Sequence, residues 1–395
     1  MQVSRQVLIP ADPGTAVMQV NTCYTGATGL RLLQQYTELV HSDTFGRVFA
    51  RTSEDNGRTW SAPEPVFTPE QTPEGVIRWG EGALFLDESR GVILHFFNYD
   101  LYPAGNYSGA VRLRTRLMIR RSTDGGKTFS PPTQLIQQGY DAEHWAEGVI
   151  YGQNSIATSF CAPIRTRAGH ILLPVQRCPL GSDFEHPFTI PWQAACFRGT
   201  WYGSRLEWEV SQFLRISPAL SGRGLGEPTV AELADGSLLM VCRGSNHNTR
   251  GALGRKWRAH SRDGGLSWSD PEPFRYNDGE PFFSPAAGSR LIRSSRNGRL
   301  YWVGNITPEN PQGNMPRYPL VIAEVDEGRL ALRRETVAVV ADRAPGQPES
   351  IQFSNFRMYE DRETGEFVLI MAHIGERGGS DLASPAYEYR ISPGA

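Results

Sequence analysis

The chain has 395 residues, including 41 glycines and 28 prolines, and a formal net charge of −2 at pH 7. A nearly neutral chain lacks the basic excess of a nucleic-acid-binding surface, so its composition argues against a nucleic-acid partner. The glycine and proline content indicates many turns, and no low-complexity tract, Pro/Ser linker or charge block divides the sequence. We therefore expect one turn-rich domain over residues 1–395.

The beginning of the chain and its cysteines bear on the compartment. Residues 1–10 lack the basic segment and long apolar core of a signal peptide, and no run approaches the length of a membrane span. The five cysteines are scattered and odd in number, and none has the spacing of a zinc or redox motif. We expect free thiols in a reducing cytoplasm, no membrane association, and no bound metal or other cofactor.

Six short apolar runs follow a glycine, as expected for strands that begin after a turn. The runs are residues 30–36, 92–97, 171–175, 237–242, 299–303 and 366–372. The glycines before them are 62 to 78 residues apart, and six units of that length account for nearly the whole chain. The sequence thus predicts an all-β, six-bladed β-propeller with four-stranded antiparallel blades.

An independent repeat has the pattern S-x-D-x-G-x-[TS]-[WF] and occurs at residues 53–60, 122–129 and 261–268. An aspartate that accepts bonds from nearby backbone and a glycine with positive φ are typical of a tight turn. The spacings, 69 and 139 residues, leave room for a degenerate copy at 201–208, and residues 327–330 hold the next position. The pattern resembles the Asp-box (bacterial neuraminidase repeat) of the sialidase superfamily. There the box is a structural turn on the outer edge of propeller blades, remote from the active site.

Aligning the six units places polar residues at one end of the predicted ring, before the first strand and after the second strand of each blade. Those we select as site candidates are Glu81, Glu227, Asn98, Arg177, Arg243, Asn305 and His373. Loops at one end of a propeller converge on a pocket, so a ring of polar groups there predicts a binding site.

Residues 226–243 resemble the fourth-blade segment of sialidases, in which a glutamate opens the blade and an arginine closes it. The resemblance implies that Glu227 is a base toward a tyrosine nucleophile and that Arg243 grips the substrate carboxylate. Arg317 falls where the last arginine of the family's triad is expected. Asp43, ten residues before the first Asp-box, lies near the family's acid/base aspartate.

Two positions depart from the family pattern. Residues 18–22 stand where sialidases have the first arginine of the triad, and they contain no arginine. The nucleophilic tyrosine, normally followed by serine, aligns with Phe353-Ser354, and a phenylalanine cannot attack an anomeric carbon. Tyr318 or Tyr359 would have to substitute for it in space, and the sequence gives no warrant for either. An ordinary sialidase reaction is therefore not expected.

Paired carboxylates offer another route to glycoside cleavage. Glu81 and Glu227 occupy equivalent positions in the second and fourth units, so both are expected to point toward the axis. Hydrolysis of a glycoside requires one carboxyl group kept protonated as acid and one ionised as base or nucleophile. Arg243 and Arg317 suit bidentate binding of an anionic sugar.

The leading prediction is a sialidase-like glycoside hydrolase that cleaves a bond at an acidic (sialic or uronic) sugar of a glycan. Glu227 is its catalytic carboxylate, Asp43 or Glu81 the partner, and the arginines the anion clamp. Two alternatives stay open. A polysaccharide lyase would abstract a uronate proton with a base such as His144, His247 or His373, and a non-catalytic propeller would only bind the glycan.

Overall fold

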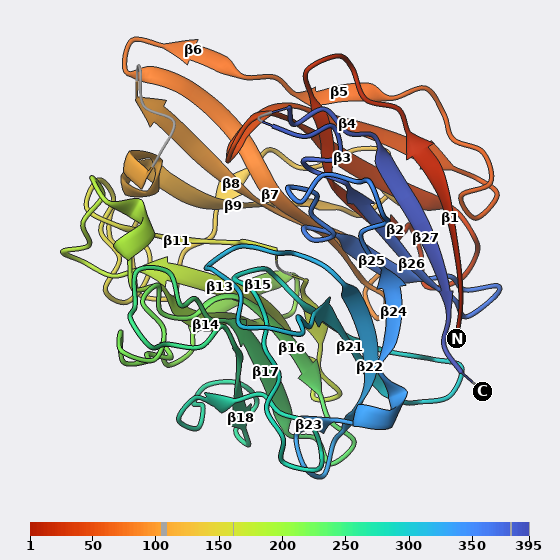
Figure 1. Ribbon diagram of the computed structural model, residues 1–395. Helices are drawn as coiled ribbons and strands as arrows, with labels where there is room; N and C mark the ends of the chain where they lie inside the picture. The colour runs from red at the N-terminus through yellow and green to blue at the C-terminus, as the bar shows by residue number, and fades with distance from the viewer. Residues whose placement is uncertain (104–108, 161, 380, 395) are drawn as a thin grey trace.

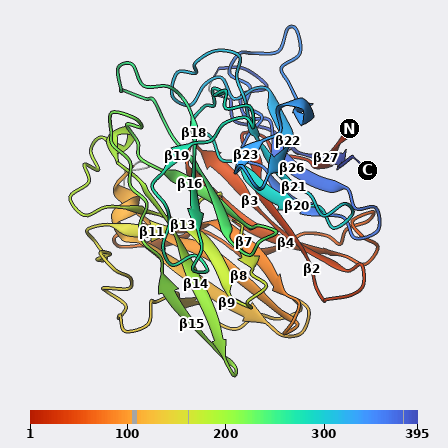
Figure 2. The same ribbon diagram turned by 90° about the horizontal axis from the view of Figure 1, so that it is seen from below.

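The computed structural model describes residues 1–103, 109–160, 162–379 and 381–394. Its strands form six small antiparallel sheets arranged around a common centre, which confirms the predicted six-bladed propeller (Figure 1). The first strands of neighbouring blades contact one another, as β2 does with β7 and β25, so these strands surround the axis. Figure 2 shows the same ring from below.

Blades 1 to 3 follow the chain from its second strand onward. Blade 1 contains β2 (Ala16–Tyr24), β3 (Leu32–His41), β4 (Thr44–Ser53) and β5 (Glu64–Phe67). Blade 2 contains β7 (Gly75–Asp87), β8 (Val92–Pro103), β9 (Thr115–Ser122) and β10 (Thr133–Gln134), with β6 (Glu70–Thr72) paired to β7. Blade 3 contains β11 (Ser155–Ala157), β13 (Ile171–Cys178), β14 (Gln193–Tyr202) and β15 (Arg205–Val210), with β12 (Ile164–Arg165) paired to β13.

Blades 4 to 6 complete the ring. Blade 4 contains β16 (Gly226–Glu232), β17 (Leu238–Arg243), β18 (Lys256–Ser261) and β19 (Glu272–Pro273). Blade 5 contains β20 (Arg290–Arg293), β21 (Leu300–Asn305), β22 (Leu320–Asp326), β23 (Ala331–Leu332) and β24 (Ala338–Ala341). Blade 6 joins β25 (Arg357–Glu360), β26 (Phe367–Ala372) and β27 (Ala386–Ser392) to the N-terminal β1 (Gln2–Ile9). Short 3-10 helices lie at η1 (Gly109–Arg114), η2 (Pro187–Thr189) and η3 (Arg334–Thr336).

The Asp-boxes are turns between the third and fourth strands of blades 1, 2 and 4. In blade 1, Ser53 Oγ donates to Asp55 Oδ1 at 2.8 Å and accepts the amide of Gly57 at 2.8 Å. Asp55 also accepts the amide and hydroxyl of Thr59, at 2.8 and 2.6 Å. The boxes at 122–129 and 261–268 repeat these bonds. The serine, aspartate and second hydroxyl of each box thus bond within the turn. The turn joining β14 to β15 falls within the predicted degenerate copy at 201–208.

Apolar side chains fill the spaces between blades. The largest such cluster joins blades 2 and 3 and contains Phe96, Trp145, Phe197 and Trp208. Burying a side chain of this size stabilises the fold by roughly 1.5–3 kcal/mol. The described cysteines, Cys23, Cys178, Cys196 and Cys242, are buried free thiols, and Cys161 lies outside the described residues. Burial raises the pKa of Cys23 to about 12, as expected for an unreactive core thiol.

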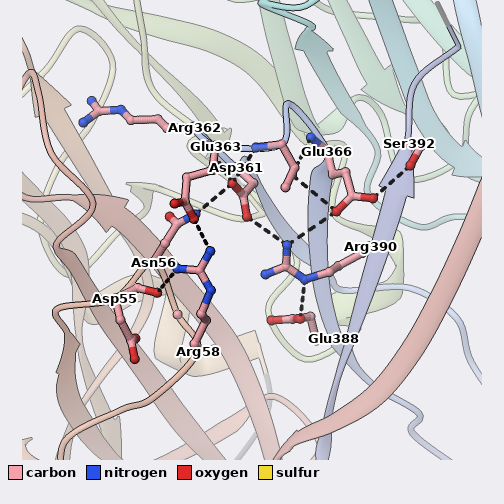
Figure 3. Close-up of polar contacts among 12 residues, drawn as sticks. Asp55, Asn56, Arg58, Asp361, Arg362, Glu363, Glu366, Glu388, Arg390 and Ser392 are labelled. Atoms are coloured by element: carbon pink, nitrogen blue, oxygen red, sulfur yellow. Dashed lines mark hydrogen bonds and ion pairs between the residues drawn. The ribbon is translucent and has the colours of Figure 1, made fainter.

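The two ends of the chain close the ring within blade 6. Strand β1 pairs antiparallel with β27, so the N-terminal and C-terminal strands lie side by side (Figure 1). A polar network then ties blade 6 to the Asp-box of blade 1 (Figure 3). Asn56 donates to Asp361 at 2.8 Å and to Glu363 at 2.9 Å, and Arg390 donates to Asp361 at 2.8 Å and to Glu388 at 3.0 Å.

Candidate active site at the propeller axis

The predicted catalytic carboxylates share an uncommon backbone conformation. Asp43, Glu81 and Glu227 have φ values of 53°, 52° and 45°. Non-glycine residues in this left-handed region cost of order 1–3 kcal/mol each, so they persist where surrounding structure fixes them, often at functional sites. At Glu81 and Glu227 the register of the first strand also shifts, between Gly80 and Ala83 and between Gly226 and Thr229. Such bulges redirect a side chain.

Side chains from the preceding or following blade hold these two bulges. The amide of Glu227 donates to Gln176 Oε1 at 2.8 Å, and a Cβ on Gly226 would lie 2.8 Å from that oxygen. Glycine at 226 therefore leaves room for Gln176 to approach, and a Cβ there would push its amide away. At the other bulge, the carbonyl of Glu81 accepts the Thr158 hydroxyl at 2.8 Å. The two carboxylates are thus oriented by contacts across blade boundaries.

Glu227 forms an ion pair with Arg243, and both side chains are largely buried. Its Oε2 atom is buried and has no hydrogen-bond partner among the described residues. An ionised oxygen without a partner is costly to bury, so this atom is the natural acceptor for a proton or a ligand hydroxyl.

Arg317 lies on the same side of the ring. Its guanidinium donates to Gln352 Oε1 at 2.9 Å, to the Ser354 hydroxyl at 3.3 Å and to the carbonyl of Ala286 at 2.9 Å. The pKa of Arg317 is lowered, and burial is the largest cause. Smaller effects come from Glu227, which raises the pKa, then Arg243, which lowers it, and then Asp43, which raises it. Arg317 therefore interacts electrostatically with Arg243, the other arginine of the predicted anion clamp, and with Glu227 and Asp43.

Arg223 belongs to the same group, although the sequence offered no pattern for it. Burial and, to a smaller extent, Arg243 lower its pKa to about 9, and Glu227 and Asp43 oppose the shift. Its guanidinium lies 5.0 Å from the ring centre of Phe188. Arg223 supplies a third cation close to Arg243 and Arg317, where residues 18–22 supply none.

Glu81 has a different environment. Its Oε2 lies 3.6 Å from Arg357 Nη2 and accepts the amide of Phe160 at 3.3 Å. Burial raises the pKa of Glu81, Arg357 and Arg112 lower it, and Glu227 raises it. The net shift is upward, which favours the protonated acid.

Asp43 is exposed at the turn between β3 and β4, and its carbonyl accepts the Tyr102 hydroxyl at 2.7 Å. Arg112 of η1 interacts electrostatically with both Asp43 and Glu81. Burial lowers the pKa of Arg112, but Asp100 and the nearby Tyr102, Asp43 and Glu81 raise it overall. Arg112 therefore links the blade 1 carboxylate to the blade 2 carboxylate.

Lys256 is fully buried in β18 and donates to the carbonyls of Pro285 at 3.1 Å and Ala287 at 2.5 Å. Burial lowers its pKa to about 7, Glu227 raises it, and the nearby arginines lower it. Even without Lys256, the arginines of the site outnumber its carboxylates, which favours an anionic ligand.

The family comparison agrees with this architecture. The model of the BNR repeat-like domain family matches residues 42–334. The chain belongs to this family. No curated protein matches the sequence.

Solved structures similar to this BNR repeat-like protein include three sialidases. The Hadza microbial sialidase Hz136 has a TM-score of 0.63 and 13% identity over 98% of this chain and 65% of its own. The Trypanosoma rangeli sialidase has a TM-score of 0.64 and 12% identity over 99% of this chain and 59% of its own. The NanB sialidase of Streptococcus pneumoniae has a TM-score of 0.64 and 11% identity over 98% and 70%. The chain thus spans about two thirds or less of the first two structures, and at these identities the likeness shows a sialidase-like fold.

Asn98 and Asn305, predicted to bind substrate, link blades of the BNR repeat-like fold. Both ends of the Asn98 amide bond Thr158 of blade 3, with Nδ2 donating to its carbonyl at 2.9 Å. Asn305 donates to the carbonyls of Arg317 and Phe353, each at 3.1 Å. Both asparagines are completely buried, so their geometry gives them a structural role.

His373 and Arg177 also lie away from the predicted catalytic carboxylates, Asp43, Glu81 and Glu227. His373 stacks on Tyr387 at 3.9 Å and shares a 2.8 Å hydrogen bond with Tyr389. Burial lowers the pKa of His373 to about 3, which leaves the ring neutral in the core. Arg177 packs over Phe213 in a separate cleft. Neither residue joins the axial group.

The position aligned with the sialidase nucleophile holds a buried side chain. Phe353 is 1% exposed and packs against His373, whereas its neighbours Gln352 and Ser354 face Arg317. Tyr359 lies beside the Asp-box of blade 1, at the opposite end of the ring. The residue aligned with the tyrosine thus supplies no hydroxyl.

Several residues of the site carry no sequence signal. Arg112 comes from η1 and Arg223 from an irregular segment, while Lys256 and Arg357 begin strands whose loops differ in length between blades. Among the described residues, no group of three or more histidine, cysteine or acidic side chains could hold a metal ion. In that same part of the chain, no helix has the length and apolarity to cross a bilayer.

Proposed function

We propose that this protein is a glycoside hydrolase that cleaves a bond at an acidic sugar, with Glu227 as base and Glu81 as acid. One observation carries the proposal. The bulges of blades 2 and 4 present two carboxylates, one of raised pKa and one paired with an arginine. Hydrolysis of a glycoside uses such a pair, in which environment keeps one group protonated and the other ionised.

The arginines would bind the sugar carboxylate. Arg223, Arg243 and Arg317 are buried or nearly so, and each interacts with Glu227. A ligand carboxylate could take bidentate bonds from guanidinium groups in this setting. Its arrival would also offset the excess positive charge around the axis.

Each step of the reaction follows from these groups. Because residue 353 is a phenylalanine, we propose direct attack by water. The water oxygen bonds to the anomeric carbon while its proton passes to Glu227. The glycosidic bond breaks as its oxygen takes the proton of Glu81. This one-step displacement predicts inversion at the anomeric carbon.

The test compares turnover of acidic glycans by the wild type and Glu227→Gln. We expect loss of about 10²–10⁴-fold in kcat in a protein that still folds, because the amide cannot accept the water proton. Glu54→Gln is the control, since Glu54 is 73% exposed in a surface ion pair. Near-wild-type turnover by Glu227→Gln would refute the assignment. Asp43→Asn, made in parallel, determines whether Asp43 rather than Glu81 donates the proton.

The products decide between the remaining alternatives. Hydrolysis yields reducing ends, whereas elimination from a uronate yields an unsaturated product with ultraviolet absorbance. Saturable binding with no product after long incubation would favour a glycan-binding propeller without catalysis.

A further inference from the structure

A cleft of about 930 Å³ lies beside blade 3 and is not used by the proposed reaction. Its lining includes Arg177 and Gln193 from adjacent strands, Leu180 from the segment between them, and Phe213 and Arg215 after β15. The cleft is large enough for a sugar residue.

Arg177 forms a buried wall of this cleft. Its side chain lies over Phe213, 3.4 Å from the ring centre, and is only slightly exposed. Nη1 donates to the carbonyl of Glu147 at 2.8 Å, and Nη2 donates to Gln193 Oε1 at 2.6 Å. Both acceptors are neutral. Within the described part of the chain, no ion pair joins Arg177 to a carboxylate.

The charge of Arg177 is therefore poorly compensated. Burial and, to a smaller extent, Arg215 lower its pKa to about 10, although Glu147 opposes the shift. Carboxylates of Glu147 and Asp270 also border the cleft, but both residues are exposed to water, which screens them. A buried guanidinium without a counter-ion favours an anionic ligand.

The cleft connects to the axial site through one short segment. Gln193, which holds Arg177, directly follows Trp192, and the guanidinium of Arg112 lies 5.7 Å from the Trp192 ring centre. In the same segment, Phe188 is 50% exposed and packs near Arg223 of the axial site. Residues 179–193 thus border both sites.

We propose that the cleft is a second anion subsite, in which Arg177 and Arg215 bind the carboxylate of another acidic sugar of the glycan held at the axis. This inference rests on the proposed function. It restricts the substrate class to glycans with at least two acidic residues, because one acidic group would occupy each site. Phe213, beneath the Arg177 guanidinium, fixes the plane in which the arginine presents its free hydrogens.

Calorimetry with paired probes tests the inference. Galacturonate and N-acetylneuraminate are the monomers, and trigalacturonate and disialic acid are the corresponding oligomers. We expect the oligomer of the recognised sugar to bind about 10- to 100-fold more tightly than its monomer. Arg177→Ala and Arg215→Ala should remove this gain without altering monomer affinity. Because Arg177 is buried and could be needed for folding, the exposed Arg215 supplies a second variant. Arg334→Ala removes a surface charge elsewhere and should have no effect.

The outcomes separate the two proposals. If monomer and oligomer bind equally, or if Arg215→Ala leaves the gain intact, the second subsite is refuted while the axial site stands. Equal weakening of monomer and oligomer by Arg215→Ala would also refute it, because the residue would then act at the axis. If no monomer binds and Arg243→Ala changes nothing, the proposed function fails, and this inference fails with it.

Discussion

Removing the carboxylate of Asp361 tests how the ring is closed. Asp361 is 2% exposed, and its two oxygens accept four hydrogen bonds. Two come from the backbone of its own turn, one from Asn56 of blade 1, and one from Arg390 on β27 (Figure 3). The side chain thus joins the last strand to the first blade.

The expected loss can be worked from these partners. Breaking a buried charge pair by deleting one member typically costs 3–5 kcal/mol, since the other charge loses its partner. Arg390 keeps Glu388 at 3.0 Å, and Asn56 keeps Glu363 at 2.9 Å. Both partners therefore stay partly satisfied, and Asp361→Ala should lower the free energy of unfolding by about 3 kcal/mol.

Urea unfolding at pH 7 measures this loss, and a pH series tests its electrostatic origin. Arg390 and the other donors outweigh burial and hold the pKa of Asp361 below its ordinary value. The unfolded state then binds a proton at higher pH than the folded state, so the contribution is complete above the unfolded pKa. It is lost as the pH falls through the lower folded pKa. Asp361→Asn keeps the size of the side chain and removes its charge. The difference in unfolding free energy between the wild type and this variant should accordingly shrink below about pH 4.

The control is Glu54→Gln, which disrupts the exposed pair between Arg31 and Glu54. Exposed pairs contribute about 0–1 kcal/mol, so this variant should unfold almost as the wild type does. If Asp361→Ala behaved like Glu54→Gln, the network would not stabilise ring closure. A loss that stayed constant down to pH 2 would refute its assignment to the ionised carboxylate.

Two further predictions concern titration near the axis. Because the pKa of Glu81 is raised, the wild-type kcat/KM should fall as the pH rises through it; Glu81→Gln should lose this alkaline limb, and a limb that persisted would refute the acid role. Lys256 has a folded pKa of about 7 against an ordinary 10.5, so the unfolded state binds more protons between these values and stability should rise with pH. Urea unfolding from pH 7 to pH 10 should show a shallower rise for Lys256→Met, and equal slopes would contradict a neutral folded lysine.

The fold could be predicted because its signals are local and repeated. A turn motif such as residues 53–60 needs only its own side chains, and the three boxes form the same internal bonds. The spacing of the glycines then aligned the six units with one another, and this alignment gave Glu81 and Glu227 equivalent positions. In the structure both lie at matching bulges. Both kinds of signal depend on neighbours close in sequence.

The environment of the site could not be predicted in the same way. Arg112 acts electrostatically on Asp43 from η1, about 70 residues later, and Arg223 acts from an irregular segment before blade 4. The type of residue at the end of a strand also did not determine whether its role is structural or in the site. Asn305 and Arg243 both end second strands, yet the asparagine bonds the carbonyls of Arg317 and Phe353 and the arginine pairs with Glu227. Asn98, predicted to follow the second strand of blade 2, lies inside β8 instead. Which role applies depends on side-chain direction across the blade boundary.

The contrast between Glu81 and Glu227 shows how a repeated scaffold can differentiate two equivalent groups. Both occupy the same bulge and the same left-handed conformation, so the backbone does not distinguish them. Their partners do. The arginine of Glu227 comes from the adjacent strand of its own blade, whereas Arg357, 3.6 Å from Glu81, comes from blade 6. Glu81 consequently pairs more loosely in a buried setting, and burial outweighs its attraction to arginine. An acid and a base can therefore arise from one structural repeat through unlike neighbours.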